Sequence, residues 1–447
     1  MEFPTESESR LCPVSAGATP GCQSPRREST EALNILAATP RSPENSRRVL
    51  IILLLAISCA LTVWYATVTF IPFIWLSDLG MGYDPFRYQV FAQRNAQYSL
   101  FDILAGPDAA SFTLTGYPVL LSLLYGLTTP DPLVGCMFNW ILWVAAGFLL
   151  VPLARPESDK SSSLPFLTLW LLYPEGFDWN GMTSKESLVA FAVACALRVC
   201  CSRARMWTQA LIVAGLAGLM LWVRLVAAPL IALAFAISFE FRNLSDRAGR
   251  SRTMLFAFAA VFVLYVVGET PTDEGGVENP LATAGYSLME QTATGGLSAG
   301  SLLREMGSSD RLVDFLWAPV RGISHLFCPL YFNPFLIPDI GTQLQWLSAA
   351  ICCAAALAIV LRMQSRQAWT RSRAVLFGVL VLGLLALGLS GILHPRYRSL
   401  IVAALLPLGL RSFREELAER GARRLIVYGT LLPAFIFLLY RILRQFS

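Results

Sequence analysis

Long apolar runs separated by short arginine-bearing segments recur along most of the chain. A hydrocarbon core of about 30 Å is crossed by roughly 20 residues of helix, and backbone polar groups inside a bilayer must be paired within the segment. The pattern therefore predicts an all-α polytopic membrane protein with about 11 transmembrane helices. The predicted spans cover residues 49–71, 133–154, 164–176, 186–202, 208–222, 225–241, 253–268, 343–362, 374–392, 399–411 and 424–441.

Residues 1–48 differ from the remainder because they are rich in Ser, Pro, Glu and Arg and show no apolar periodicity. Such a segment cannot bury enough surface to offset its chain entropy. We predict a disordered cytoplasmic tail over 1–48, followed by a single transmembrane domain over 49–447. The first apolar run begins at Val49 and has no small-residue cleavage site after it, so we expect it to remain as an anchor.

Arginines in the connecting segments predict the orientation, because short cytoplasmic loops retain positive charge. Arg47 and Arg48 place the N-terminus in the cytoplasm, and basic segments near 155–160, 198–205, 242–252, 362–373 and 411–424 fall on the same side. We expect the plasma (inner) membrane as the location. Two long loops, 76–132 and 269–325, then face the extracytoplasmic side, and long loops in a compact bundle are usually functional.

The first of these loops contains an apolar segment, Tyr117 to Leu127, that is too short to span a membrane. It follows Gly116 and has Pro118 near its start, which is favourable for the beginning of a helix. We predict an interfacial helix lying along the extracytoplasmic surface.

Composition supports the membrane class and excludes several others. The chain is 55% hydrophobic and 15% charged, with a mean hydropathy of +0.55, which is too apolar for a soluble domain. The pI near 8.7 reflects arginines in the loops, so no nucleic-acid partner is expected. Ten cysteines include no CxxC pair and no His/Cys ligand spacing, so we expect no structural disulfides, no zinc site and no cofactor.

Ionisable residues beside membrane spans are costly and each requires a reason. Asp84 follows the first span, with Asp78 six positions earlier and Tyr88 four positions later. A carboxylate there could act as a general base on an acceptor hydroxyl. The structural alternative is that Asp84 caps a helix that has Pro85 in its first turn.

A second group of candidates lies between 173 and 186. Lys185 is one of two lysines in the chain, against 33 arginines, and a compact ammonium suits a phosphate oxygen. Glu186 is either a functional carboxylate or the partner of Thr183 in a capping box. Asp178 is a further candidate in the same segment.

Two further regions supply candidates for anion binding. Arg224 interrupts an apolar run long enough for a helical hairpin, and it either snorkels to headgroups or binds an anion. In the second long loop, Arg321 and His325 are four residues apart and would share one face of a helix, and Glu290 is a candidate carboxylate. An exposed basic turn is the alternative for these arginines.

The late segment His394-Pro395-Arg396-Tyr397-Arg398 ends a predicted span. In an extended segment Arg396 and Arg398 would point to the same side. Two guanidiniums on one side suit a pyrophosphate or phosphodiester, and His394 could bond the phosphate or the acceptor. The alternative is a pair of headgroup anchors.

Taken in order, these motifs resemble the GT-C type of integral membrane glycosyltransferases, which use polyprenyl-phosphate sugars on the extracytoplasmic face. The resemblance covers about residues 50 to 410 and implies that Asp84, or Asp78 in its place, is the catalytic carboxylate. It implies phosphate contacts from Arg224, Arg396 and Arg398, to which we add Lys185 as a further cation for the leaving phosphate. The first loop lacks a paired Asp-Asp or Asp-Glu, so a divalent metal is not indicated.

Other functions fit the same motifs. Some polysaccharide polymerases share this layout and join lipid-pyrophosphate-linked repeat units of an exopolysaccharide or O-antigen. A transporter or lipid flippase is a third hypothesis, which the lack of an internal repeat disfavours. The expected partners are a polyprenyl-linked sugar or oligosaccharide, the lipid bilayer, and polysaccharide export or flippase machinery.

Overall fold

The computed structural model describes residues 43–76, 84–105, 116–155, 163–224, 227–243, 319, 322–323, 326, 340–363, 370–390 and 395–420. The chain divides into two compact units, Met1–Val49 and Leu50–Ser447. All regular structure in the described residues is helical, and these residues contain no strand.

The first helix, α2 (Pro43–Tyr65), begins inside the segment predicted to be disordered. Pro43 occupies its first position and Glu44 its first turn, and Arg48 Nη2 lies 2.7 Å from Glu44 Oε1 one turn later. Proline, an acidic first turn and an i,i+4 ion pair all favour a helix start. The prediction of disorder was therefore wrong for residues 43–48, and residues 1–42 lie outside the described part.

The chain continues from α2 through a π-helical turn, η1 (Ala66–Phe70), into α3 (Ile71–Leu76). The first long loop then contributes α4 (Asp84–Asn95), α5 (Leu100–Ala105) and α6 (Tyr117–Leu127). Helix α6 has the bounds predicted from its apolar pattern, and it packs against α4, α5 and α7. Its place along a membrane surface stays a prediction.

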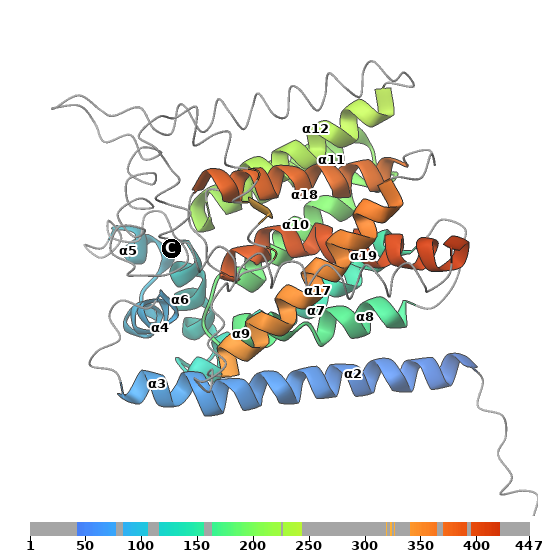
Figure 1. Ribbon diagram of the computed structural model, residues 1–447. Coiled ribbons are helices and arrows are strands. Elements are labelled where there is room, and N and C mark those ends of the chain that lie inside the picture. The colour runs from blue at the N-terminus through green and yellow to red at the C-terminus, as the bar shows by residue number, and fades with distance from the viewer. Residues whose placement is uncertain are drawn as a thin grey trace, which may run out of the picture. The chain divides into compact units, whose positions relative to one another are not determined.

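The remaining helices are α7 (Pro132–Ala154), α8 (Leu164–Leu171), α9 (Pro174–Asn180), α10 (Glu186–Cys200), α11 (Met206–Val223), α12 (Ala227–Asn243), α17 (Ile340–Met363), α18 (Arg371–Ser390), the 3-10 turn η4 (Pro395–Arg398) and α19 (Ser399–Arg420). Helix α10 packs against α7, α12 and α19, and α17 packs along α19 (Figure 1).

Five helices in the described residues are long and apolar enough to cross a membrane: Glu44–Phe70, Pro132–Ala154, Met206–Val223, Gln343–Met363 and Arg371–Gly388. They indicate a membrane protein, as the composition predicted. The count of about 11 spans stays a prediction. Two of the predicted spans, 253–268 and 424–441, lie outside the described residues.

The predicted span 164–176 is not one continuous helix. Helix α8 ends at Leu171, Tyr173 adopts an extended conformation with ψ of 120°, and α9 begins at Pro174. A residue that precedes proline is disfavoured in the helical region, which explains the break at Tyr173. The break redirects the chain and gives α9 a separate position, with Glu175 in its first turn.

Two tryptophans lock α7 to α8 close to this break. The rings of Trp143 and Trp170 stack with centroids 4.1 Å apart. Each indole N–H donates to the carbonyl oxygen of the other residue, at 3.0 Å from Trp143 and 2.8 Å from Trp170. The buried polar edge of both rings is thereby satisfied, and the start of α9 is held against a rigid aromatic core.

Candidate functional site

The structure describes six of the predicted site residues with their side chains: Tyr88, Asp178, Lys185, Glu186, Arg224 and Arg398. Asp84 is the first residue of α4 and Arg396 lies in η4, and for these two the backbone position is given. The other predicted residues, Asp78, Glu290, Arg321, His325 and His394, lie outside the described residues.

The turn between α9 and α10 contacts the first helix of the first long loop, α4. Helix α10 begins at Glu186, and Thr183 Oγ1 donates to the carbonyl oxygen of Pro85 at 2.7 Å. A capping box would need Thr183 at the N-cap and Glu186 three residues inside the helix, so that alternative for Glu186 was wrong. The Thr183 bond instead places the Pro85–Phe86 peptide, in the first turn of α4, beside this turn.

Lys185 lies in the same turn, with its Nζ 5.6 Å from the centroid of the Tyr88 ring. The distance is within the range of a cation–π interaction. Tyr88 also meets Tyr117 of α6 edge to face, with centroids 5.7 Å apart. Lys185 is half-buried, so its ammonium is more accessible than the guanidiniums of Arg224 and Arg398.

Arg224 lies at the connection between α11 and α12, which confirms the predicted helical hairpin. Its Nη1 donates to Glu186 Oε1 at 3.1 Å, and both side chains are 5% exposed. On the other side its Cζ lies 4.3 Å from the centroid of the Tyr397 ring. We call Tyr88, Lys185, Glu186, Arg224 and Tyr397 the Arg224 cluster.

Arg398, the next residue after Tyr397, forms a completely buried ion pair with Glu175 of α9. Its Nη2 donates to Glu175 Oε1 at 2.7 Å and to the carbonyl oxygen of Gln345 at 3.2 Å. Glu175 Oε2 accepts from the Tyr173 hydroxyl at 3.1 Å, and the Glu175 backbone N–H donates to Ser348 Oγ at 2.9 Å. We call these five residues the Arg398 cluster.

Glu175 is completely buried, and the Arg398 guanidinium is its ion-pair partner. The sequence analysis missed Glu175, although a carboxylate in the last turn of a predicted apolar span is the signal that singled out its neighbours.

Asp178 has a different surrounding from the one expected for a substrate-binding carboxylate. Its Oδ1 accepts from the Tyr65 hydroxyl at 2.6 Å, and the side chain is buried. This contact joins α9 to α2. Asn139 of α7 supports the same region, because its Nδ2 donates to the carbonyl oxygens of Met182 and Ser184 at 2.8 and 2.9 Å.

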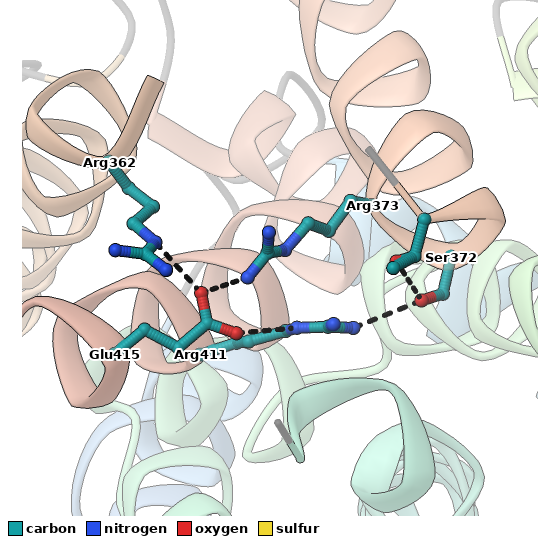
Figure 2. Close-up of polar contacts among 6 residues, drawn as sticks. Arg362, Ser372, Arg373, Arg411 and Glu415 are labelled. Atoms are coloured by element: carbon teal, nitrogen blue, oxygen red, sulfur yellow. Dashed lines mark hydrogen bonds and ion pairs between the residues drawn. The ribbon is translucent and has the colours of Figure 1, made fainter. Parts of the chain in front are cut away.

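A second polar region joins α17, α18 and α19 (Figure 2). Arg362 Nε donates to Glu415 Oε2 at 3.0 Å, Arg373 Nη2 binds the same oxygen, and Arg411 Nε donates to Oε1 at 3.2 Å. Arg411 Nη1 also donates to Ser372 Oγ at 3.0 Å. We call these five residues the Glu415 cluster, in which three guanidiniums surround one carboxylate.

The arginines of the Glu415 cluster were predicted to share one side of the membrane. Arg371, which was predicted on that side as well, donates to the carbonyl oxygens of Cys200 and Ser202 and to Ser238 Oγ. The basic segments near 200, 362–373 and 411 therefore meet, as one-sided placement requires. Which side faces the cytoplasm stays a prediction.

None of the three clusters has the composition of a metal centre. Within the described part of the chain, no three His, Cys, Asp or Glu side chains lie together in a way that could hold a metal ion.

Comparisons of the chain with models of protein families, with curated proteins and with solved structures gave no match.

Proposed function

We propose that the protein is a membrane glycosyltransferase of the GT-C type. It would move a glycosyl unit from a polyprenyl-phosphate or polyprenyl-pyrophosphate donor to an acceptor hydroxyl, in the synthesis of a cell-surface polysaccharide or glycoconjugate. The observation that supports this is the convergence of four distant segments in the Arg224 cluster: α4, the turn before α10, the α11–α12 connection and η4. Two cations, two aromatic rings and one carboxylate from segments far apart in the sequence come together there.

The chemistry follows from the charges of this group. Lys185 and Arg224 would stabilise the negative charge that develops on the leaving phosphate, because fixed cations in a water-poor site need no reorganisation during the reaction. Glu186 holds Arg224 in place through its 3.1 Å bond. Asp84, which precedes the Pro85 carbonyl that Thr183 binds, would be the base that takes the acceptor proton.

The orientation belongs to the same proposal. We place the N-terminus and the Glu415 cluster on the cytoplasmic side, because arginine-rich connections are retained there. The Arg224 cluster would then face the extracytoplasmic side of the plasma membrane. The span count of about 11 is part of this topology, with additional spans over 253–268 and 424–441.

The test is a deletion in the native organism complemented with variants of the full chain, followed by mass spectrometry of the cell-surface glycan. We expect the deletion to lack a sugar, and Asp84→Asn and Lys185→Met to leave that defect while the protein accumulates normally. Lys185 is half-buried, and methionine keeps most of the length of its apolar stem, so accumulation of the variant in the membrane is measured beside the glycan. Arg94→Gln, which changes an exposed guanidinium on α4, is the matched control and should restore the sugar.

Each outcome bears on a separate part of the proposal. An unchanged glycan in the deletion strain would show that the protein does not transfer a sugar. A complete glycan in the Asp84→Asn strain would remove Asp84 as the base, and a complete glycan with Lys185→Met would remove the Arg224 cluster from the reaction. Accumulation of single lipid-linked repeat units would indicate a polymerase instead.

A further inference from the structure

The connection between α10 and α11 carries two arginines, Arg203 and Arg205, that no acidic residue accompanies. The sequence contains no Asp or Glu between Glu186 and Glu240. Both arginines are exposed, and neither side chain forms a hydrogen bond or an ion pair within the described part of the chain. The connection therefore presents two positive charges that no carboxylate of the described residues binds.

The backbone of this connection is fixed by hydrogen bonds from two helices. Gln209 Nε2 of α11 donates to the carbonyl oxygen and to the hydroxyl of Ser202, at 3.0 and 3.1 Å. Arg371 of α18 donates to the same carbonyl oxygen at 3.2 Å and to that of Cys200. The two arginines that follow are two positions apart, so their Cα atoms are at most about 7 Å from each other. Both long side chains can therefore reach one phosphate group.

The exposed face of α11 continues this surface with an aromatic ring and an aliphatic side chain. Trp207 is 86% exposed, and Leu211, about one turn further along the helix, is 76% exposed. Residues four apart lie on the same face of a helix. Helix α11 is also one of the five described helices that are long and apolar enough to cross a membrane. The order along this face is therefore cation, amphipathic ring and aliphatic chain.

This order matches a phospholipid from its headgroup to its acyl chains. Guanidiniums bind phosphate oxygens through two parallel hydrogen bonds. A tryptophan ring prefers the level of the headgroups, and Leu211 lies about 6 Å further along the helix, toward the hydrocarbon. A zwitterionic headgroup already carries its own cation. Two arginines without an acidic partner therefore favour a headgroup with a net negative charge.

We propose that Arg203, Arg205, Trp207 and Leu211 form a binding site for an anionic glycerophospholipid of the surrounding bilayer. We call these four residues the α11 lipid site. Arg224 lies at the opposite end of α11, 19 positions from Arg205, which is about 29 Å along a helix. The α11 lipid site is thus separate from the Arg224 cluster and goes beyond the proposed reaction. In the orientation proposed above, it takes its lipid from the cytoplasmic leaflet.

Native mass spectrometry of the purified full chain in detergent measures this binding without turnover. Phosphatidylglycerol and phosphatidylethanolamine with identical acyl chains are titrated separately, and the fraction of protein with one bound lipid gives each Kd. We expect phosphatidylglycerol to bind at least about tenfold more tightly, because only its headgroup has a net negative charge.

Glutamine variants of the two arginines test the source of this preference. Arg203→Gln and Arg205→Gln should each raise the Kd of phosphatidylglycerol about fivefold, and the double variant should raise it about 30-fold. The Kd of phosphatidylethanolamine should change by less than about twofold in all three. Folding should be retained, because both side chains are exposed and make no hydrogen bond in the described structure.

Trp207→Ala separates the contribution of the ring from that of the charges. The ring contacts the apolar part of either lipid, so its loss should raise both Kd values by the same factor. The preference for phosphatidylglycerol should therefore be unchanged in this variant.

Arg48→Gln is the matched control for the loss of one arginine. Arg48 is also an exposed residue near the start of an apolar helix, but its guanidinium is bound to Glu44 at 2.7 Å. The Kd of phosphatidylglycerol for this variant should equal that of the wild type.

The proposal is overturned if the wild type binds the two phospholipids equally well, or if the double glutamine variant keeps the preference. It is also overturned if Arg48→Gln weakens binding as much as Arg205→Gln does, because the lipid would then be attracted by surface arginines in general. Dimers of the wild type that are lost in Trp207→Ala would assign this face to a second copy of the chain instead.

Discussion

The Arg398 and Glu415 clusters use the same two residue types in opposite proportions. In the Glu415 cluster, three guanidiniums share one carboxylate, and no nitrogen of these three is among the buried described atoms that lack a partner. In the Arg398 cluster, one guanidinium meets one carboxylate, and two of its nitrogens remain without a partner. The first arrangement is complete within the protein, whereas the second leaves two guanidinium nitrogens without a hydrogen-bond partner in the described part of the chain.

The two clusters also stand at matching positions on two packed helices. The interval from Gln345 to Arg362 on α17 and the interval from Arg398 to Glu415, along α19, both cover 17 positions. At 1.5 Å per residue this is about 26 Å, close to the thickness of a hydrocarbon core. The α17 residues between the ends carry no charge. The Arg398 cluster therefore lies at one end of the uncharged α17 segment, and the Glu415 cluster lies at its other end.

The largest expected effect comes from breaking the Glu175–Arg398 pair. Arg398→Met leaves a completely buried carboxylate without its cation and should lower the free energy of unfolding by about 3–5 kcal/mol. The double variant Glu175→Leu with Arg398→Met removes both charges and should recover most of this loss. SDS-induced unfolding of the purified protein measures both, and a double variant as unstable as the single one would show that the pair is not the cause.

A smaller effect is expected at the other end, and its size depends on which residue is removed. Glu415→Gln takes away the carboxylate that Arg362, Arg373 and Arg411 share, and should cost about 3 kcal/mol. Arg362→Met should cost only about 1 kcal/mol, because the other two guanidiniums keep Glu415 paired. The same SDS-induced unfolding compares them, and equal losses would contradict the sharing of one carboxylate by three arginines.

The fold was predictable wherever one physical rule dominated the local sequence. Apolar length located α7, α11, α17 and α18 to within a few residues, and the limit on span length separated α6 from the spans. The rule failed at Tyr173, where the conformational effect of Pro174 overrode an apolar pattern. It also placed the start of α2 too late, because capping and ion pairing extended a polar stretch into helix.

The site was predictable in part, because the cost of charge near a membrane identifies residues but does not pair them. Lys185, Glu186, Arg224 and Arg398 were singled out by this rule. The structure brings the first three into the Arg224 cluster, and Arg398 follows Tyr397 of that cluster and pairs with Glu175. The partners could not be read from the sequence: Glu175 pairs with a residue 223 positions away. The aromatic face of Tyr397 was likewise visible only once α12 and η4 were placed.

The contact between Arg224 and Tyr397 offers a third test, with a smaller effect. A guanidinium that lies 4.3 Å from a ring centroid and is largely desolvated should gain about 1 kcal/mol from the cation–π interaction. A double-mutant cycle of Arg224→Met and Tyr397→Leu, measured by SDS-induced unfolding, should therefore give a coupling energy of about 1 kcal/mol. If the losses of the two single variants add up to the loss of the double variant, the ring and the guanidinium are close but do not stabilise each other.

The smallest expected effect is a change in the free energy of unfolding that should differ in sign between a serine of the Glu415 cluster and the serine that follows Arg398. Ser372 Oγ accepts from Arg411 Nη1 at 3.0 Å, so Ser372→Ala removes a hydrogen bond to a charged group and should cost about 1–2 kcal/mol. Ser399→Ala removes a buried hydroxyl that has no partner, so in the free protein it should be neutral or slightly stabilising. SDS-induced unfolding without ligand compares the two variants directly. Because the substitution is chemically the same, equal destabilisation by both would mean that the Ser399 hydroxyl is hydrogen-bonded in the folded protein, as the Ser372 hydroxyl is.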